Sequence, residues 1–576
     1  MIKKHLALLV LLTALTLLAC SKDPASEGLE YTLTEDKTYA VTDIGTCLDD
    51  EIIIPSEYKG KKVTAIGEDA FANASRPESI TIPHTVTTIG EGAFRGCDAL
   101  RSIHIPDSVT KLGASALADC PDLTAVTLGD GLVTIEEQTF HGCAALSSVT
   151  MGKSVESIQK QAFASCSSLT SITLPEGLKT LGREAFLDCF HLAEVINLSA
   201  MEIEPGSESY GQVAFYATEV HTGDTHLITD GDFIFYSAED KTYLVAYTGS
   251  SKNLPLPADH RGAPYAIRRY AFLHRSDLAS VTIPEGITEI GEEAFKGCSG
   301  LTEITVPATV TRMGQNAFES CDSLTSLTLP FVGENRSPGT NHQIGHLFGG
   351  RGNTNLPSSL RTVTVHGDVA IDSQAFFRCA HLQRVILDGV TTVGPSAFAS
   401  CPALTEVVFT ESLTEIGDDA FSSCPQLTAV FVPGDGVLDL GGGAFEDCTS
   451  LTSAFIKDGA ARIGAYTFFG CRSLTETNAA ETATEIEDFA FSGCSKLTHV
   501  TLSEALTSIG QSAFFGCSSL TFLTIPESTV SLGNSAFHGC ERLADVYYPG
   551  TAAQWRALAR EDIFSSTPPR VHYNAE

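Results

Sequence analysis

The amino-acid sequence predicts a repeat solenoid that has short parallel β-strands plus a short helical turn in each 23-residue coil. The main observation is a motif, L-x-x-I-x-I-P-x-x-V-x-x-I-G-x-x-A-F-x-x-C, which recurs through most of the 576 residues. A second observation is that its A-F position carries a large apolar anchor eighteen times, mostly at intervals of 23 residues. Such a period is typical of stacked units, none of which can bury its apolar face alone. The anchors are Phe71, Phe94, Leu117, Phe140, Phe163, Phe186, Phe272, Phe295, Phe318, Phe348, Phe376, Phe398, Phe421, Phe445, Phe468, Phe491, Phe514 and Phe537.

Each part of the motif predicts one element of the coil. The L-x-x-I-x-I part alternates apolar and variable positions, which indicates a short β-strand with one face turned inward. The proline that follows ends this strand, because proline cannot donate a hydrogen bond to the ladder. The V-x-x-I-G part predicts a second short extended piece, and A-F-x-x-C predicts a tight helical turn. Burial within one coil does not offset the conformational entropy of ordering its residues, so the coils must stack.

Fifteen of the 17 cysteines stand three residues after an anchor and therefore form a column through the predicted stack. Adjacent coils lie about 4.8 Å apart, a spacing at which cysteines can form disulfides. The side chains of a ladder nevertheless point in parallel, which favours a column of free, buried thiols. Pairing of some of these cysteines is the alternative. The column comprises Cys97, Cys120, Cys143, Cys166, Cys189, Cys298, Cys321, Cys379, Cys401, Cys424, Cys448, Cys471, Cys494, Cys517 and Cys540.

The first residues have the pattern of an export signal. Two lysines precede the apolar run Leu6–Leu18, which is too short to span a bilayer as a helix. The run ends in L-L-A-C, with the cysteine at Cys20, and resembles the box at which bacterial lipoproteins are cleaved and acylated. This resemblance implies a lipoprotein signal peptide at 1–19, a lipidated Cys20 that anchors the chain to a membrane, and a tether at 20–30. An ordinary signal peptide with a chance cysteine is the alternative.

Breaks in the period divide the rest of the chain into arrays and connecting segments. A first array covers 31–200 and a second covers 270–545, and the irregular residues 201–269 between them contain a restart of the array. Within the second array, the Gly- and Asn-rich residues 331–357 predict a loop that projects from one coil. Residues 546–576 follow the last repeat and predict a C-terminal cap over the end of the core.

Two segments outside the repeats predict elements of their own. The aromatic and β-branched runs Phe233–Tyr236 and Tyr243–Tyr247 flank Ala238–Lys241, which predicts a β-hairpin at the restart. The segment Thr551–Leu558 carries Trp555, the only tryptophan of the chain, and predicts a short helix within the cap.

Composition and motifs argue against several functional classes. The 70 acidic and 36 basic residues give a formal net charge of −34, which repels phosphate backbones and argues against a nucleic-acid partner. The usual metalloprotease, phosphate-loop, hydrolase and calcium-loop motifs do not occur. His342 and His346 have no neighbouring ligand cluster, and turn chemistry explains Asp230 and Asp232 better than calcium does. We therefore expect a non-enzymatic protein without a metal or cofactor.

The repeat motif resembles the BspA-like class of leucine-rich repeats, and the resemblance covers about 31–573. It makes the predicted fold a solenoid of the leucine-rich-repeat type and implies a bacterial surface protein that binds host-matrix proteins, other bacteria or glycans. With the lipoprotein box, it implies a lipid-anchored protein of the bacterial cell envelope, exposed on the outer membrane. We expect adhesion through a protein, peptide or glycan ligand. A structural or nutrient-handling surface scaffold is the alternative.

A stripe of apolar side chains on the outer strand face is the candidate binding site. The outward position between the two inward residues of L-x-x-I-x-I is threonine in most coils. Four successive coils instead carry Ile386, Val408, Phe431 and Phe455 there, while Arg384 and Glu406 lie in the neighbouring outward column. An exposed apolar stripe on a soluble array typically marks a contact surface, here for a protein or peptide. The alternative is that an inserted loop or a second copy covers it.

Overall fold

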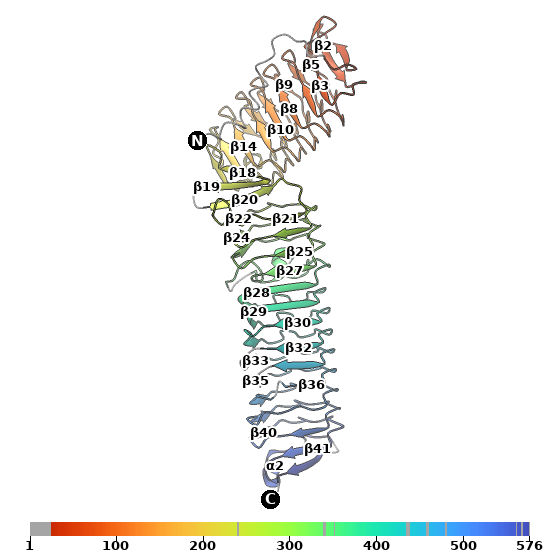
Figure 1. Cartoon of the computed structure of the whole chain (residues 1–576), viewed down its shortest axis with the longest axis vertical. Coiled ribbons are helices and arrows are strands. Elements are labelled where there is room, and N and C mark those ends of the chain that lie inside the picture. The colour runs from red at the N-terminus through yellow and green to blue at the C-terminus, as the bar shows by residue number, and fades with distance from the viewer. Residues whose placement is uncertain are drawn as a thin grey trace. The chain divides into compact units, whose positions relative to one another are not determined.

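The computed structural model describes residues 25–238, 241–337, 341–350, 352–433, 438–456, 460–478, 481–559, 562–565 and 568–574. The chain divides into two compact units, and the boundary between them lies between Ile228 and Thr229. Both units are parallel β-solenoids, with about 23 residues per turn and little helix, so the predicted fold class is confirmed. Within each unit, successive strands stack one above the next (Figure 1). Within the described ranges, no helix has the length and apolar character that crossing a bilayer requires.

In the first unit, the L-x-x-I-x-I segments stack as one row, or ladder, of strands and the V-x-x-I-G segments as another, and each ladder comprises two hydrogen-bonded sheets. The longer strands are β3 (Glu51–Ile53), β6 (Ser79–Thr81), β8 (Ser102–Ile105), β10 (Ala125–Leu128), β12 (Ser148–Thr150), β14 (Ser171–Leu174), β16 (Glu194–Asn197) and β17 (Glu219–His221). The shorter ladder contains β5 (Lys61–Ile66), β7 (Thr88–Ile89), β9 (Lys111–Leu112), β11 (Thr134–Ile135), β13 (Ser157–Ile158) and β15 (Thr180–Leu181). At the N-terminal end the antiparallel pairs β1–β2 and β4–β5 close the stack, formed by β1 (Glu30–Leu33), β2 (Tyr39–Asp43) and β4 (Glu57–Tyr58).

The second unit begins with the predicted β-hairpin, in which β19 (Phe233–Ala238) pairs antiparallel with β20 (Lys241–Tyr247) next to β18 (Leu227–Asp230). The longer ladder contains β21 (Asn253–Pro255), β23 (Ser280–Thr282), β25 (Glu303–Thr305), β27 (Ser326–Leu329), β28 (Thr362–Ile371), β29 (Arg384–Val393), β30 (Glu406–Phe409), β32 (Ala429–Val432), β34 (Ser453–Ile456), β36 (Glu476–Thr477), β39 (Phe522–Thr524), β41 (Asp545–Tyr548) and β42 (Arg570–Tyr573). The shorter ladder contains β22 (Tyr265–Ile267), β24 (Ile287–Ile290), β26 (Arg312–Met313), β31 (Glu415–Ile416), β33 (Leu438–Leu440), β35 (Ala460–Ile463), β37 (Glu485–Ile486), β38 (Ser508–Ile509) and β40 (Ser531–Leu532).

Strands β28 and β29 are each ten residues long and belong to both ladders at once. In most other coils a proline or a glycine ends the first strand, and the second strand starts separately. In these two coils His366 and Asp388 occupy that position, and they pair with each other across the ladder. Because both residues can continue the backbone hydrogen bonds, the two short strands merge into one.

The A-F-x-x-C segment forms tight turns, whereas the sequence predicted a helical turn. Around Phe163, for example, Gln161 and Ser165 adopt left-handed backbone conformations, with φ of 54° and 62°. The turns are not helical because several of their backbone N–H groups donate to carbonyl groups of the next coil. The N–H of Phe163 donates to the carbonyl of Ala185 in the next coil at 2.8 Å, so these hydrogen bonds run between coils and not within a helix.

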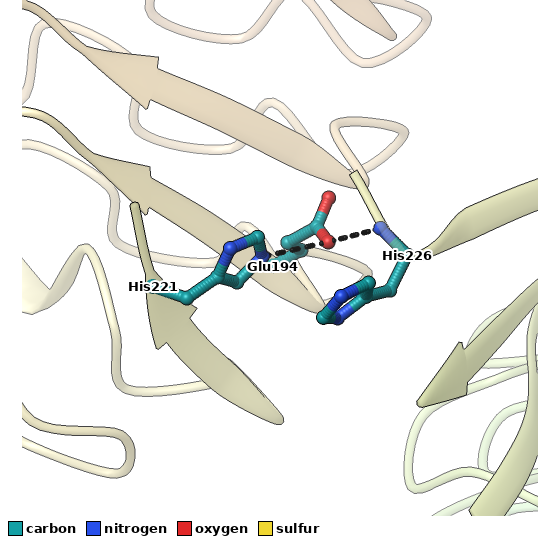
Figure 2. A group of neighbouring side chains, drawn as sticks. All are labelled: Glu194, His221 and His226. Carbon is teal, nitrogen blue, oxygen red and sulfur yellow. Dashed lines mark hydrogen bonds and ion pairs between the residues drawn. The ribbon is translucent and has the colours of Figure 1, made fainter. Parts of the chain in front are cut away.

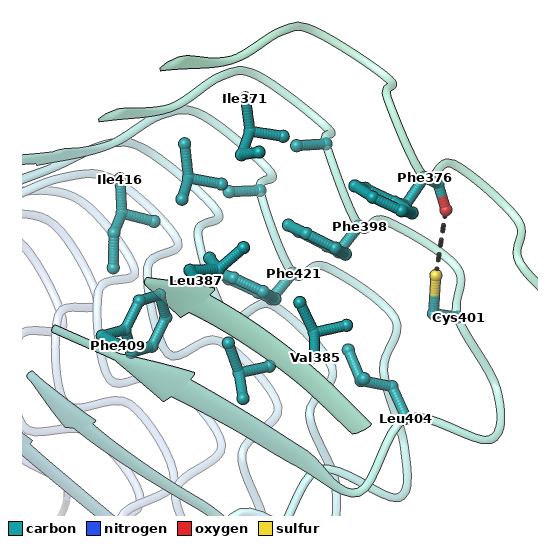
Figure 3. Packing of buried hydrophobic residues seen from close by; sticks show 14 of the residues in the cluster. Ile371, Phe376, Val385, Leu387, Phe398, Cys401, Leu404, Phe409, Ile416 and Phe421 are labelled. Carbon is teal, nitrogen blue, oxygen red and sulfur yellow. Dashed lines mark hydrogen bonds between the residues drawn. The ribbon is translucent and has the colours of Figure 1, made fainter. Parts of the chain in front are cut away.

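The anchors lie in one column in each unit, in which successive phenylalanine rings stack, with an interruption at Leu117 in the first unit. In Figure 3, Phe376, Phe398 and Phe421 lie with their rings nearly parallel, and their centroids are 4.7 and 5.1 Å apart. The cysteine column runs beside them, and all sixteen cysteines of the described residues are free and buried. The predicted column of free thiols is therefore confirmed.

The segment 331–357 differs from its prediction as a projecting loop. Phe331, Ile344 and Leu347 are buried, and the 3₁₀-helix η2 (Ile344–Phe348) places the anchor Phe348 in the core. These apolar side chains complete one enlarged coil, because a projecting loop would leave them in water. A second 3₁₀-helix, η1 (Tyr210–Gln212), lies near the end of the first unit.

The last coil is followed by the short helix predicted around the only tryptophan. Helix α2 (Ala552–Leu558) begins with a capping box formed by Thr551 and Gln554. Trp555 is buried, and its ring lies 5.3 Å from that of Tyr548. The large indole thus covers apolar surface next to the last repeat.

Candidate ligand-binding surface

The four apolar residues of the predicted stripe lie in one row across four neighbouring strands. Ile386 of β29 is in register with Val408 of β30, and Phe431 of β32 is in register with Phe455 of β34. Strands β30 and β32 pair through Glu406 and Ala429, which places Val408 beside Phe431. Equivalent positions of parallel strands point to the same side of the sheet, so the four side chains form one continuous stripe.

The stripe is accessible to solvent, while its strand neighbours face the core. Phe431 keeps 59% of its surface exposed, and Ile386, Val408 and Phe455 are half-buried. Val430 precedes Phe431 in the same strand and is only 2% exposed. A phenylalanine side chain that is exposed in the middle of a paired sheet is not stabilised by packing in the core. Core packing therefore does not account for Phe431.

An ion pair lies beside the stripe in the neighbouring outward column. Arg384 Nε is 2.9 Å from Glu406 Oε2, and both side chains are about half exposed. An exposed pair of this kind stabilises a protein by about 0–1 kcal/mol. The pair leaves two polar groups at the edge of an apolar surface, where they can orient a ligand.

Polar residues close both ends of the stripe. At one end Thr364 of β28 is in register with Ile386. At the other end Asn478, which follows β36, donates from its amide nitrogen to the carbonyl of Ile456 at 2.7 Å and accepts from the N–H of the same residue at 2.8 Å. The apolar surface is therefore limited to four coils.

Comparison with protein families then decides what kind of repeat this is. The model of the BspA type leucine rich repeat region matches residues 64–193, 265–336, 357–452 and 438–565, more than half of the chain. The chain belongs to the BspA-type leucine-rich-repeat family. All six residues of the candidate surface lie within the matched ranges: Phe455 is in the fourth range, and the other five are in the third.

Comparison with solved structures found several bacterial proteins that are similar to this chain. A protein from Bacteroides ovatus is 21% identical, covers 96% of this chain and 100% of its own, and superposes with a TM-score of 0.35. A leucine rich cell surface protein from Faecalibacterium prausnitzii is also 21% identical, with coverages of 94% and 99% and a TM-score of 0.22. The pneumococcal vaccine antigen PcpA is 16% identical, with coverages of 96% and 98% and a TM-score of 0.24. The sequence has no match among curated proteins.

The BspA-type solenoid also carries aromatic residues that sequence reasoning missed. Tyr466 and Phe489 occupy left-handed turn positions two residues before their anchors, and their rings stack at 5.0 Å. Phe469 packs edge-on against Tyr466, which is 40% exposed. The sequence could have indicated these residues, because most other coils carry a small or polar residue two positions before the anchor.

A cavity of about 490 Å³ opens on the strand face of the first unit. Its lining includes Met151 and Leu198, together with Thr150 and Thr173 of the outward threonine column. This hollow is a second place at which a side chain of a ligand can insert, although the sequence alone gave no reason to select it.

The histidines considered as metal ligands in the sequence analysis do not form a cluster. His342 Nδ1 lies 2.5 Å from Asp372 Oδ2, and burial lowers the pKa of His346 below its usual range.

In the described part of the chain, one group of three metal-binding side chains does occur, formed by Glu194, His221 and His226. Sequence reasoning missed this group, which Figure 2 shows at the end of the first unit. Cys20 lies outside the described residues.

Proposed function

We propose that this protein is a cell-surface adhesion protein whose apolar stripe binds a protein or peptide ligand. Leucine-rich-repeat proteins generally bind proteins or other ligands, and their fold is typically non-enzymatic. The observation that carries the proposal is Phe431, which is 59% exposed in a column that most other coils fill with threonine. Desolvating a phenylalanine contributes about 1.5–3 kcal/mol, which gives such a residue the character of an interface anchor.

The stripe favours recognition by side chains over the addition of a β-strand. Strands β30, β32 and β34 all have a paired neighbour on each side, so their backbone groups are already hydrogen-bonded. A ligand therefore has to lay apolar side chains across Phe431 and Phe455. Arg384 and Glu406 then lie at the rim, where exposed charges affect specificity and the association rate more than affinity.

The proposed location follows from the lipoprotein box. An acylated Cys20 would hold the chain at the bacterial outer membrane, since several acyl chains contribute about 0.8 kcal/mol per buried CH₂ group. A tether at 20–30 would separate the first coil from the bilayer. Coils held in this way would present their strand face to molecules outside the cell.

The test is a binding screen of the mature protein against host-matrix proteins, bacterial surfaces and glycans. We expect a saturable protein or peptide ligand, and we expect Phe431→Ser/Phe455→Ser to weaken it about tenfold or more. Phe522→Ser is the matched control, because Phe522 is 49% exposed on a strand of the same unit but outside the stripe.

Two outcomes contradict the proposal. If the folded double variant binds every ligand found as tightly as the parent, the stripe is not the site. If no ligand saturates, the protein is a surface scaffold. A glycan that binds in place of a peptide, with the same loss in the double variant, would retain the site and change the ligand class.

A further inference from the structure

At the end of the first unit, one column of outward-facing strand residues changes from small to charged side chains. In the five preceding coils this column contains small, uncharged residues, which are Ser79, Ser102, Ala125, Ser148 and Ser171. The next two coils carry Glu194 and Glu219, and the two glutamates are directly in register on the adjacent parallel strands β16 and β17. Like charges placed directly opposite each other on neighbouring strands destabilise a sheet. Positive charge is therefore needed between them.

Two histidines lie beside the glutamates. His221 stands two residues after Glu219 and so points to the same side of β17, where its Nε2 is 3.0 Å from Glu194 Oε1. His226 follows a short turn, and its Nδ1 is 2.9 Å from Glu219 Oε2. The two imidazole rings are stacked at 4.7 Å. Figure 2 shows the His221 ring and the backbone nitrogen of His226 joined to the Glu194 carboxylate by hydrogen bonds.

Glu194 is the most constrained member of the cluster. Its side chain has no exposed surface, although it belongs to the outward column of the strand. The carboxylate accepts hydrogen bonds from the backbone N–H of His226 at 2.6 Å and from the Thr225 hydroxyl at 2.5 Å. A buried carboxylate is stable only when it is paired with a cation or coordinates a metal. The turn 222–226 thus helps to hold the Glu194 carboxyl group out of water.

We propose that Glu194, His221 and His226 bind one zinc ion, and that Glu219 orients the His226 ring. One ligand atom from each of the three side chains lies within 4.8 Å of the others. Zinc binds imidazole nitrogen and carboxylate oxygen at about 2.0–2.2 Å in a tetrahedron, which places neighbouring ligand atoms about 3.3 Å apart. The separation of 3.0 Å between His221 Nε2 and Glu194 Oε1 is close to this value.

The remaining parts of the cluster match those of a zinc site. A carboxylate that accepts a hydrogen bond from a metal-bound histidine fixes the ring orientation, and Glu219 occupies this position next to His226. Water completes the tetrahedron. The ion would supply the charge that two facing glutamates require, and it would join β16, β17 and the turn that follows them. Zinc therefore stabilises the last coil of the first unit.

The experiment uses the full chain, purified in detergent and stripped of metals with a chelator. Calorimetric titration with Zn²⁺ should show one bound ion per chain, and the Tm should rise with the Zn²⁺ concentration. His221→Gln and His226→Gln should each weaken binding about tenfold or more, and Glu219→Gln by about 10–100-fold. The His226 side chain is 38% exposed, so His226→Gln should keep the fold even if Glu194→Gln does not.

His141→Gln is the matched control. His141 pairs with Asp119 at 3.7 Å on the surface of the same unit, without further ligands. The buried cysteines are present in every variant, so they cannot produce differences between them. The proposal is overturned if the stripped parent binds no Zn²⁺ saturably. It is also overturned if the His221→Gln and His226→Gln variants bind Zn²⁺ as tightly as the His141→Gln control.

Discussion

The thiol of Cys401 donates a hydrogen bond to the backbone carbonyl of Phe376, one coil earlier, over a distance of 3.1 Å (Figure 3). The same carbonyl accepts the N–H of Cys379 within its own turn. Most other cysteines of the column make the same contact with the preceding anchor, for example Cys166 with Phe140 at 3.2 Å. The column is therefore both an apolar filler and a ladder of hydrogen-bond donors.

Replacing Cys401 with alanine should destabilise the protein by about 1–3 kcal/mol. The substitution removes a buried sulfur and leaves the Phe376 carbonyl with one donor fewer. The free energy of unfolding, measured by denaturant titration with circular dichroism, checks this expectation. Thr501→Ala, at an exposed position of a later coil, is the control and should change the free energy of unfolding by less than about 0.5 kcal/mol. If the two substitutions changed the free energy of unfolding equally, the cysteine column would not contribute to stability as argued.

Stability should fall as the solution becomes alkaline. Burial raises the pKa of the Cys298 thiol from 9.0 to about 12, and burial also raises the pKa values of Cys448 and Cys471. Above pH 9 the unfolded chain loses thiol protons that the folded chain keeps, so the free energy of unfolding decreases between pH 9 and 12. Below pH 9 these thiols contribute no pH dependence.

The alkaline effect can be measured from denaturation midpoints at pH about 8 and about 10. The decrease should be smaller in Cys298→Ala, because that variant has one buried thiol fewer to titrate. A decrease of the same size in the variant would assign the pH dependence to lysine and tyrosine side chains instead.

Truncating one anchor should damage the core severely. Phe163 has no exposed surface, and its ring lies 5.1 Å from the rings of both Phe140 and Phe186. Phe163→Ala should therefore cost about 3–5 kcal/mol through lost burial and a cavity. Thr173→Ala, on the exposed strand face of the next coil, should change stability little. A similar midpoint shift for both would contradict the phasing of the repeat.

The regular part of the fold was predictable because its signal is repeated. Each coil gives an independent reading of which positions face the core, so Phe163 and Val126 could be assigned to the interior from spacing alone. The backbone conformation of the tight turns was harder to predict from the sequence. Left-handed residues such as Gln161 and Ser165 are not glycines, and their conformation depends on hydrogen bonds to the next coil.

Features that depend on contacts between irregular segments could not be predicted. Glu194 and Glu219 are in register although the 23-residue repeat is broken between them. The candidate zinc site therefore becomes visible only when the structure places β17 beside β16. The burial of Ile344 likewise depends on how the enlarged coil closes. The exposed stripe, in contrast, lies within regular coils, and the alternation of inward and outward residues placed Phe431 on the surface correctly.

A thiol count provides a prediction about the whole cysteine complement. All sixteen described cysteines are free, whereas Cys20 should be blocked by its lipid thioether. The mature protein, unfolded without a reductant, should therefore react with sixteen equivalents of a thiol reagent, and the native protein with almost none. Fewer than half that number in the unfolded protein would indicate disulfide pairing in the column.

Replacing Cys20 with serine should release the protein from membranes. Serine cannot form the thioether that carries the lipid, and the apolar run Leu6–Leu18 is too short to hold the chain in a bilayer as a spanning helix. We expect the parent to pellet with membranes after a high-salt wash and Cys20→Ser to remain in the supernatant. Cys47→Ser is the control, because it changes another cysteine outside the repeat column and should still pellet. If Cys20→Ser also pellets and withstands the wash, the protein is held at the membrane by something other than a lipid on Cys20.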